Sequence, residues 1–242
     1  MAHFYLLENL ETTQVGAIVT LDGSEGRHAS TVSRVRVGEK LAIGNGRGLM
    51  LGAEVLTASK DAVELSVTSV EVTKRESPAI VLVQALAKTD RDERAVEACT
   101  ELGISAVIPW AADRSVSKWE GPKVDKGIAR WAAIVREATK QSIRPFLPKV
   151  GPHLKSSQLG TALQGMNVLV LDPTGEESLS EVKLDGRDIA LVVGPEGGIS
   201  EHELTRFEEE GAHIVKMGTN ILRTSTAGPA ALAILNAKLG RC

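Results

Sequence analysis

The feature that most constrains the fold is the apolar run Ile189–Val193, IALVV, which contains no polar residue and stops at residues 194–200, GPEGGIS. A strand without polar alternation is typical of a parallel sheet that helices cover on both faces. Such sheets bind their ligands beyond the carboxyl ends of the strands. The run therefore predicts an α/β domain whose binding crevice lies at residues 194–200.

The composition of the 242 residues, 43% of them hydrophobic, allows one large globular domain or two smaller ones. No stretch reaches ~18 consecutive apolar residues, and the first residues lack the basic flank and apolar core of a secretory signal. We therefore expect a soluble cytoplasmic protein without a membrane span. Cys99 and Cys242 are far apart and the five histidines lack metal-ligand spacing, so we expect two plain thiols and no metal site.

The charges are unevenly distributed along the chain. The net charge of −3 argues against a general polyanion binder, but residues 123–149 carry seven basic residues against two acidic ones. Apolar residues recur at helical spacing through residues 124–142, so the basic residues fall on the other face of an amphipathic helix. This face is either a phosphate-binding patch or a solvated helix surface, and the pattern favours neither. The basic residues are Lys123, Lys126, Arg130, Arg136, Lys140, Arg144 and Lys149.

Residues 40–72 consist of short apolar segments separated by turn signals, among them Asn45-Gly46, and predict a small β-barrel or sandwich. Residues 25–39 interrupt this pattern with a short helix. Its basic side chains either contact a nucleic-acid backbone or are solvated on a helix that closes the barrel with Val32 and Val35 inward. We favour the backbone contact, because this domain is otherwise slightly acidic. The side chains concerned are Arg27, His28, Arg34 and Arg36.

Near residue 75 the pattern changes from strand–turn–strand to strand–helix–strand, which predicts a domain boundary. The second domain has predicted strands at residues 79–87, 106–110, 167–172, 188–194 and 213–218. Its predicted helices lie at residues 90–103, with Cys99 on the core side, at 124–142, after Ser200, and at 226–239.

Three loops follow strands of the second domain, at residues 171–178, 194–200 and 218–228, and they meet at one edge if the sheet is parallel. The second loop has neither the GxGxxG spacing of a dinucleotide site nor the ending of a P-loop, so it does not predict a polyphosphate cradle. Its paired glycines, Gly197 and Gly198, indicate backbone close to a ligand or a tight turn with positive φ. Directly afterwards, the S-x-x-E sequence from residue 200 to residue 203 predicts a capping box that begins a helix.

Arg223 precedes the predicted start of the last helix, where Thr224, Ser225 and Thr226 supply hydroxyl groups that can cap it. At the carboxyl edge of the sheet an arginine would point into the crevice. The alternative is a salt bridge between Arg223 and Glu196.

The motifs at these loops strongly resemble those of the RsmE family of 16S rRNA uracil-N3 methyltransferases, members of the SPOUT class. The resemblance spans nearly the whole chain, and GPEGG followed about twenty residues later by ILRT is specific to this family. The matching motifs are Arg27-His28 followed by Arg34 and VGE, ELG at 101–103, KQSIR with Pro148, GPEGG at 194–198, and ILRTSTA at 221–227. The chain departs from the usual family pattern at His3, Arg27, Thr219, Asn220 and Ser225.

The resemblance implies a PUA-like β-barrel RNA-binding domain at residues 1–73 and a SPOUT α/β methyltransferase domain with a deep trefoil knot at residues 76–242. It implies an enzyme that uses S-adenosylmethionine to methylate N3 of a specific uridine in 16S rRNA of the small ribosomal subunit. It also implies a homodimer whose site lies at the subunit interface. Two alternatives are a SPOUT methylase for another base or a ribose 2′-hydroxyl, and a noncatalytic RNA-binding or ribosome assembly protein.

For such a reaction we hypothesise roles for two residues of the loops. Arg223 would stabilise the charge that develops on uracil, and Glu196 would orient the base or relay its proton. The implied cofactor contacts are Leu171, Asp172, Pro173, Val193, Gly194, Gly197, Gly198, Met217, Gly218, Asn220, Leu222, Thr224 and Thr226. The expected RNA contacts are Arg27, His28, Arg34, Arg36, Lys88, Lys126, Arg130, Lys140 and Arg144.

Overall fold

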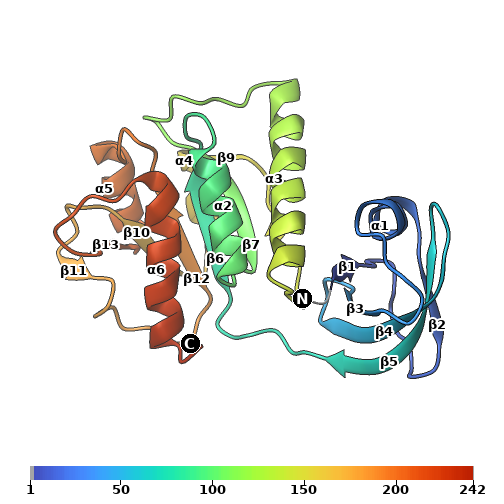
Figure 1. Ribbon diagram of the computed structural model, residues 1–242. Helices are drawn as coiled ribbons and strands as arrows, with labels where there is room; N and C mark the ends of the chain where they lie inside the picture. Colours follow the sequence, from blue (N-terminus) through green and yellow to red (C-terminus); the bar gives the residue numbers. More distant parts are fainter. Residues whose placement is uncertain (1–2, 242) are drawn as a thin grey trace. The chain divides into compact units, whose positions relative to one another are not determined.

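The structure is a computed structural model that describes residues 3–241 (Figure 1). The chain divides into two compact units, Met1–Arg75 with Thr139–Leu147, and Glu76–Ala138 with Pro148–Cys242. The division between residues 75 and 76 lies where the sequence pattern changes. The segment 139–147, however, belongs to the first unit, although the sequence analysis placed it in the second.

The first unit is built on a five-stranded sheet in the order β1-β3-β4-β5-β2. Neighbouring strands are antiparallel except for β1 and β3, which pair in parallel. The apolar residues on the inner face form one core that includes Leu21, Ile43 and Leu65, each of them fully buried. The strands are β1 (Phe4–Leu6), β2 (Ile18–Leu21), β3 (Lys40–Gly44), β4 (Leu49–Ala58) and β5 (Val63–Val72).

The turn between β3 and β4 forms where the Asn45-Gly46 signal predicted it. The Asn45 side-chain oxygen accepts hydrogen bonds from the backbone N–H of Arg47 at 2.8 Å and of Leu49 at 3.1 Å. Gly46 has φ of 67°, a conformation that glycine adopts readily. The hairpin is therefore stabilised by local turn chemistry.

The predicted short helix of the first unit is an α-helix, α1 (Gly23–Arg27), continued by a π-helical turn, η1 (His28–Val32). Val35 is buried, but Val32 is 70% exposed. The alternative in which both valines point inward is therefore wrong for Val32.

The segment 139–147 joins the first unit through backbone and side-chain contacts. Gly48 N–H donates to the Pro145 carbonyl, and Leu147 N–H donates to the Gly46 carbonyl, both at 2.9 Å. The Lys140 ammonium lies 3.2 Å from a carboxylate oxygen of Glu25, and both side chains are about nine-tenths buried. Lys140 is therefore not the surface cation that the helical pattern predicted.

The second unit is an eight-stranded sheet in the order β11-β13-β10-β12-β6-β7-β8, with β9 also paired to β7. All of these pairs are parallel, and β12 is buried along its whole length, as the run Ile189–Val193 predicted. The strands are β6 (Ile80–Ala85), β7 (Ala106–Ala111), β8 (Lys149–Val150), β9 (Leu154–Lys155), β10 (Asn167–Leu171), β11 (Glu177–Ser178), β12 (Ile189–Val193) and β13 (His213–Lys216).

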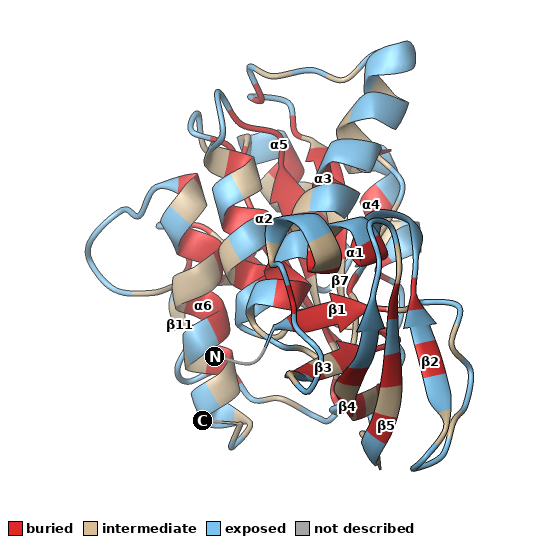
Figure 2. Ribbon diagram, turned by 45° about the vertical axis from the view of Figure 1, so that its right-hand side comes forward, coloured by how far each residue is buried: buried red, intermediate tan, exposed pale blue. Residues whose placement is uncertain are grey.

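Helices cover both faces of this sheet. On one face α2 and α6 pack side by side against β6 and β12, each with one face buried and one exposed (Figures 1 and 2). On the other face Leu159 of α4 and Phe207 of α5 join a core with Val83, Val170 and Val192. The helices are α2 (Arg91–Glu101), α3 (Pro122–Gln141), α4 (Ser156–Ala162), α5 (Glu201–Glu209) and α6 (Thr224–Lys238).

Several predictions about the interior have clear outcomes. Cys99 is buried where α2 meets α6, and burial raises the pKa of its thiol, which agrees with an inert core residue. Cys242 lies outside the described residues. Among residues 3–241 no helix is long and apolar enough to cross a membrane, and no group of histidine, cysteine and acidic side chains could hold a metal ion. The sequence analysis missed β1, β2, α4 and the short strands β8, β9 and β11.

The Lys140–Glu25 pair predicts a stability effect in the first unit. We expect Lys140→Met to lower the free energy of unfolding by about 3 kcal/mol, because it removes the Lys140 cation from the buried Glu25 carboxylate. Urea denaturation measures this change. Adding Glu25→Gln should restore part of the loss. The exposed Lys40→Met is the matched control and should change stability by less than about 0.5 kcal/mol; an equally small effect of Lys140→Met would contradict the prediction.

Candidate active site

The three predicted loops meet at the carboxyl ends of three adjacent strands, β13, β10 and β12. Together they line a cavity of about 590 Å³. Arg223 and Glu196 are both on its wall. The wall also includes Leu171, Asp172, Pro173, Thr174, Val193, Gly194, Gly197, Gly198, Ile199, Ile221, Leu222 and Thr224.

A smaller cavity of about 80 Å³ adjoins the first on the β13 side. The two share Leu171, Asp172, Pro173, Ile221, Leu222 and Ala227. It adds Met217, Gly218 and Asn220 to the wall. Twelve of the thirteen residues expected to contact a cofactor therefore line one cavity or the other. The thirteenth, Thr226, is exposed on the first turn of α6 and lines neither.

Two of the loops take the backbone conformations that their residues favour. Gly198 and Gly218 have φ of 72° and 126°, in the region that other residues avoid. A Cβ added at Gly218 would meet no atom within 4 Å, so the backbone there borders open space. In the loop after β10, the Asp172 carboxylate accepts hydrogen bonds from Thr174 N–H at 2.9 Å and from its hydroxyl at 2.7 Å, which fixes the turn.

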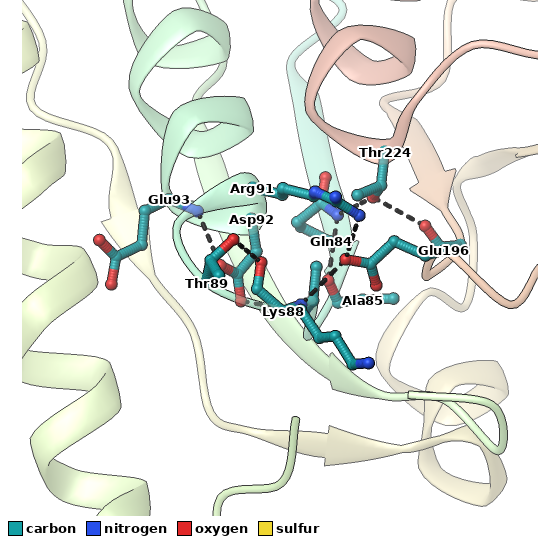
Figure 3. A network of polar contacts seen from close by, with 11 residues as sticks. Gln84, Ala85, Lys88, Thr89, Arg91, Asp92, Glu93, Glu196 and Thr224 are labelled. Atoms are coloured by element: carbon teal, nitrogen blue, oxygen red, sulfur yellow. Dashed lines mark hydrogen bonds and ion pairs between the residues drawn. The ribbon is translucent and has the colours of Figure 1, made fainter. Parts of the chain in front are cut away.

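Glu196 is held by a fourth loop, which follows β6 (Figure 3). One of its carboxylate oxygens accepts hydrogen bonds from the Lys88 backbone N–H and from the Arg91 guanidinium, each at 3.0 Å. The partner of Glu196 is therefore Arg91, and the alternative of a salt bridge to Arg223 is wrong. Lys88 of this loop was expected only as an RNA contact, and the support that the loop gives to Glu196 was not predicted from the sequence.

Asp92 shapes the loop that holds Glu196. Its carboxylate accepts hydrogen bonds from the backbone N–H groups of Ala87 at 3.1 Å and Glu93 at 2.9 Å. Burial raises the pKa of this carboxyl group, and the two backbone hydrogen bonds act in the opposite direction. Within the same loop Thr89 has φ of 60°, an uncommon value for threonine. Asp92 thus fixes the loop from the side of α2.

The start of α6 is fixed by Thr224. The buried Thr224 hydroxyl donates to the Gly194 carbonyl at 2.8 Å and accepts a hydrogen bond from the Gln84 side-chain amide at 2.9 Å (Figure 3). The N-cap is Arg223, and its side chain makes no capping hydrogen bond. The expectation that hydroxyl groups cap this helix is therefore wrong for Thr224, which connects three segments of the site. Its partner Gln84 could have been noticed as the one polar residue within the apolar run AIVLVQALA.

Arg114 also lies on the cavity wall and was not predicted from the sequence. Its guanidinium donates to the carbonyl oxygens of Gly197 at 3.3 Å and Ile199 at 3.4 Å. A Cβ added at Gly197 would lie only 3.1 Å from the Arg114 Cβ, so glycine allows the arginine stem to approach. Gly197 therefore serves the packing of Arg114 in addition to the turn.

The predicted capping box is present at the start of α5. The Ser200 hydroxyl accepts from Glu203 N–H at 3.2 Å, and the Glu203 carboxylate accepts from Ser200 N–H at 3.0 Å. Glu203 is 1% exposed and also accepts from Asp113 N–H at 2.8 Å and the Ser156 hydroxyl at 2.6 Å. One buried carboxylate thus connects the exit of GPEGGIS to the segments that follow β7 and β9.

The residues expected to contact RNA differ in their exposure and in their ion pairs. In the first unit Arg34 and Arg36 are exposed, and Arg27 is exposed with its guanidinium 3.2 Å from Asp61. His28 is half-buried and packs edge-to-face with Tyr5, with 5.9 Å between the ring centres. Arg27, Arg34 and Arg36 thus all lie at the surface of this unit.

The four expected RNA contacts on α3 and directly after it belong to two different units. Lys126 and Arg130 belong to the second unit, whereas Lys140 and Arg144 belong to the first. Arg130 donates through two guanidinium nitrogens to the Glu93 carboxylate, which reduces its charge toward a phosphate. Lys126 is exposed on α3, and Lys88 is exposed beside Glu196.

Comparison with known proteins identifies the family. Residues 75–236 match the RNA methyltransferase domain family, and residues 21–68 match the RNA methyltransferase PUA domain family. The ribosomal RNA small subunit methyltransferase E of Mycobacterium tuberculosis is 37% identical over 247 residues, which cover 100% of this chain and 94% of that protein.

Solved structures have the same architecture. A ribosomal RNA small subunit methyltransferase E from Neisseria gonorrhoeae, bound to S-adenosyl methionine, has a TM-score of 0.87 at 30% identity over 98% of both chains. A methyltransferase from Legionella pneumophila, in complex with the bound cofactor SAM, has a TM-score of 0.89 at 28% identity over 98% of both chains. The resemblance seen in the motifs is confirmed: this chain belongs to the ribosomal RNA small subunit methyltransferase E family.

Proposed function

We propose that this protein transfers a methyl group from S-adenosylmethionine to N3 of a specific uridine in 16S rRNA of the small ribosomal subunit. One observation carries the proposal: the cavity at the ends of β10, β12 and β13 brings Arg223 and Glu196 together with the loops expected to bind the cofactor. Family membership over the whole chain supports it independently.

The residues of the site fit S-adenosylmethionine. A cavity of about 590 Å³ falls within the range of about 300–1,000 Å³ that encloses ligands of this size. Its wall combines apolar side chains such as Leu171 and Leu222 with the glycine backbone at residues 194, 197 and 198. When bound, the cofactor supplies an electrophilic methyl carbon. The loops after β10, β12 and β13 would hold it, with Met217, Gly218 and Asn220 on the β13 side.

Arg223 has the position and charge to stabilise the reacting base. Uracil must lose its N3 proton before N3 acts as a nucleophile, and negative charge then spreads onto the neighbouring carbonyl oxygens. Arg223 is exposed at the cavity wall, directly before the first turn of α6, where the helix dipole adds positive potential. A guanidinium there donates hydrogen bonds to the oxygen that gains charge.

Glu196 would act on the proton side of the same base. Arg91 and the Lys88 N–H hold one of its oxygens, which fixes the direction of the carboxylate. A fixed carboxylate accepts a hydrogen bond from uracil N3–H and thereby orients the base or relays its proton. Arg91 is therefore a positioning residue for Glu196.

The trefoil knot, the homodimer and the cytoplasmic location are further parts of this proposal. After β13 the chain returns past the ends of β10 and β12 to begin α6 beside β6, a path compatible with passage through the loop 172–188. Ile221 in this returning segment is 81% exposed, which suits burial by a second copy of the chain. A crystal structure tests the threading, and sedimentation analysis tests the dimer.

The proposed reaction is tested by identifying the product. We expect the full chain, incubated with labelled S-adenosylmethionine and small-subunit particles or their RNA, to yield labelled 3-methyluridine after digestion to nucleosides. Label in another nucleoside would assign the enzyme to a different base or to a ribose hydroxyl. Tight RNA binding without any labelled product would support a noncatalytic RNA-binding protein instead.

The role of Arg223 predicts a separation of binding from turnover. We expect Arg223→Ala to lower turnover about 10²-fold, because a donor to the developing charge is lost, while calorimetric affinity for S-adenosylmethionine stays nearly unchanged. Arg187→Ala, which removes an exposed arginine before the opposite end of β12, is the control and should retain turnover. Wild-type turnover in Arg223→Ala would remove Arg223 from the mechanism.

The proposed RNA contacts predict a salt-dependent affinity. We expect the logarithm of the RNA dissociation constant to rise linearly with the logarithm of salt concentration, because lysine and arginine displace counterions from phosphates. Replacing Arg34 and Arg36 by Gln should reduce this slope by about two. Lys40→Gln, on the same unit, is the control. An affinity that does not change with salt would contradict phosphate contact by these residues.

A further inference from the structure

Another cavity, of about 500 Å³, lies in the second unit and is called the second cavity below. It shares no residue with the two cavities of the candidate active site. It opens beyond the carboxyl end of β7. Its walls come from the segment after β7, the start of α4 and one face of α5. The lining residues include Ala112, Asp113, Ser115, Lys118, Trp119, Glu120, His153, Lys155, Ser156, His202 and Arg206.

The wall between this cavity and the active-site cavity is thin. Arg114 lines the active-site cavity, whereas its neighbours Asp113 and Ser115 line the second one. In α5 the same relation holds for Glu201 and His202. The buried Glu203 carboxylate holds this wall together through its hydrogen bonds to Asp113, Ser156 and Ser200.

Two buried polar atoms at the second cavity lack hydrogen-bond partners among residues 3–241. They are the Ser115 hydroxyl, in a residue that is 6% exposed, and the Nε2 atom of His153. Burial, and then the nearby Lys155, lowers the pKa of His153, so its imidazole is neutral at neutral pH. A buried polar atom without a partner is costly, so a ligand with hydrogen-bonding groups gains affinity if it pairs with both atoms.

An aromatic ring lies beside these atoms. The half-buried Trp119 packs edge-to-face on Trp131 at 5.3 Å between ring centres and lies 5.5 Å from the His153 ring. A Cβ added at Gly127 in α3 would lie 2.5 Å from the indole carbons, so the absence of a side chain there lets the ring lie against the helix. The structure thus places a fixed indole at the cavity, and an indole offers a surface for stacking.

Two exposed lysines supply positive charge at the rim of the cavity. Lys118 and Lys155 are exposed, and His202 lies nearby on α5. Arg206 is engaged with Glu210 at 3.0 Å and with the Ser157 carbonyl at 3.1 Å. Two acids also line the cavity: Asp113, which accepts from the Ser200 hydroxyl at 2.9 Å, and the exposed Glu120. The two exposed lysines therefore provide the positive charge for a phosphate.

We propose that this cavity is a nucleoside phosphate-binding site, separate from the methyl-transfer site. The base or sugar ring stacks beside Trp119, the polar edge of the base bonds Ser115 and His153, and the phosphate lies at Lys118 and Lys155. An aromatic face, neutral hydrogen-bonding groups and flexible cations in one cavity of this volume suit a nucleotide better than a bare anion. The ligand is either a free nucleotide or one unit of an RNA strand.

Calorimetric titration of the full chain with cytidine 5′-monophosphate tests the site, since this probe contains neither the uracil of the proposed substrate nor the adenine of the cofactor, and the variants below assign the binding to this cavity. We expect a dissociation constant below about 1 mM, with cytidine alone and inorganic phosphate alone binding more weakly. Tryptophan fluorescence should change on binding, and this change should be lost in Trp119→Phe because Trp110 and Trp131 are buried.

Two substitutions separate this site from any other. Ser115→Ala and His153→Phe should each weaken cytidine monophosphate binding about tenfold, with His153→Phe keeping a ring beside Trp119. His213→Phe, an exposed histidine paired with Glu177, is the control and should bind as the wild type does. Thermal melting, monitored by circular dichroism, checks that each variant is folded. If His153→Phe does not fold, binding by Ser115→Ala alone decides the test.

The results divide clearly. Tighter binding of a short cytidine oligonucleotide than of the mononucleotide, lost in the same variants, would assign the site to an RNA strand, and equal binding would assign it to a free nucleotide. Absence of binding, binding unchanged in Ser115→Ala, or phosphate alone binding as tightly as the nucleotide would overturn the proposal. None of these results depends on methyl transfer, so they are distinct from a failure of the proposed function.

Discussion

The position of the active site depends on one buried hydroxyl group, that of Thr224. It joins the end of β6 through Gln84, the start of the GPEGG loop through Gly194, and the first turn of α6. In the low-dielectric interior these hydrogen bonds are strong, and leaving any partner unpaired is costly. Because Arg223 directly precedes Thr224, the hydrogen bonds of Thr224 also fix the backbone position from which the Arg223 side chain extends. The packing of Gly228 against Cys99 then determines how α6 continues along α2.

The parts of the fold that the sequence predicted are those set by local pattern and by one topological rule. The unbroken run Ile189–Val193 indicated a strand with both faces covered, and the carboxyl ends of parallel strands must share an edge, so three loops could be grouped in advance. What could not be predicted involves residues far apart in the chain. The pairing of Gly48 with Pro145 and the support of Glu196 by the loop after β6 each join residues about a hundred positions apart, and neither has a local signature.

The pattern of basic residues predicted surface cations poorly, because the sequence does not show which of them are paired with acidic residues in the fold. A count of basic residues along α3 treats each as solvated, yet Lys140 is buried against Glu25 and Arg130 is bound by Glu93. The same helical spacing that places basic residues on one face also brings some of them to acids from other elements. The arginines of residues 27–36 differ, since they lie on a short helix and the segment after it and remain exposed. The proposed electrostatic attraction of RNA therefore rests more on these arginines than on the basic residues of α3.

Glu203 shows how a residue first noticed for local chemistry can organise a larger region. As part of the capping box with Ser200 it begins α5, a role that the spacing alone predicted. Its complete burial and its bonds to Asp113 and Ser156 also make it the centre of the wall between the active-site cavity and the cavity beyond the end of β7. Coupling between two sites requires an element with two arrangements, each favoured by a different ligand. A wall held by several hydrogen bonds to one buried carboxylate has one strongly preferred arrangement, so it favours two sites of fixed geometry over a switch between them.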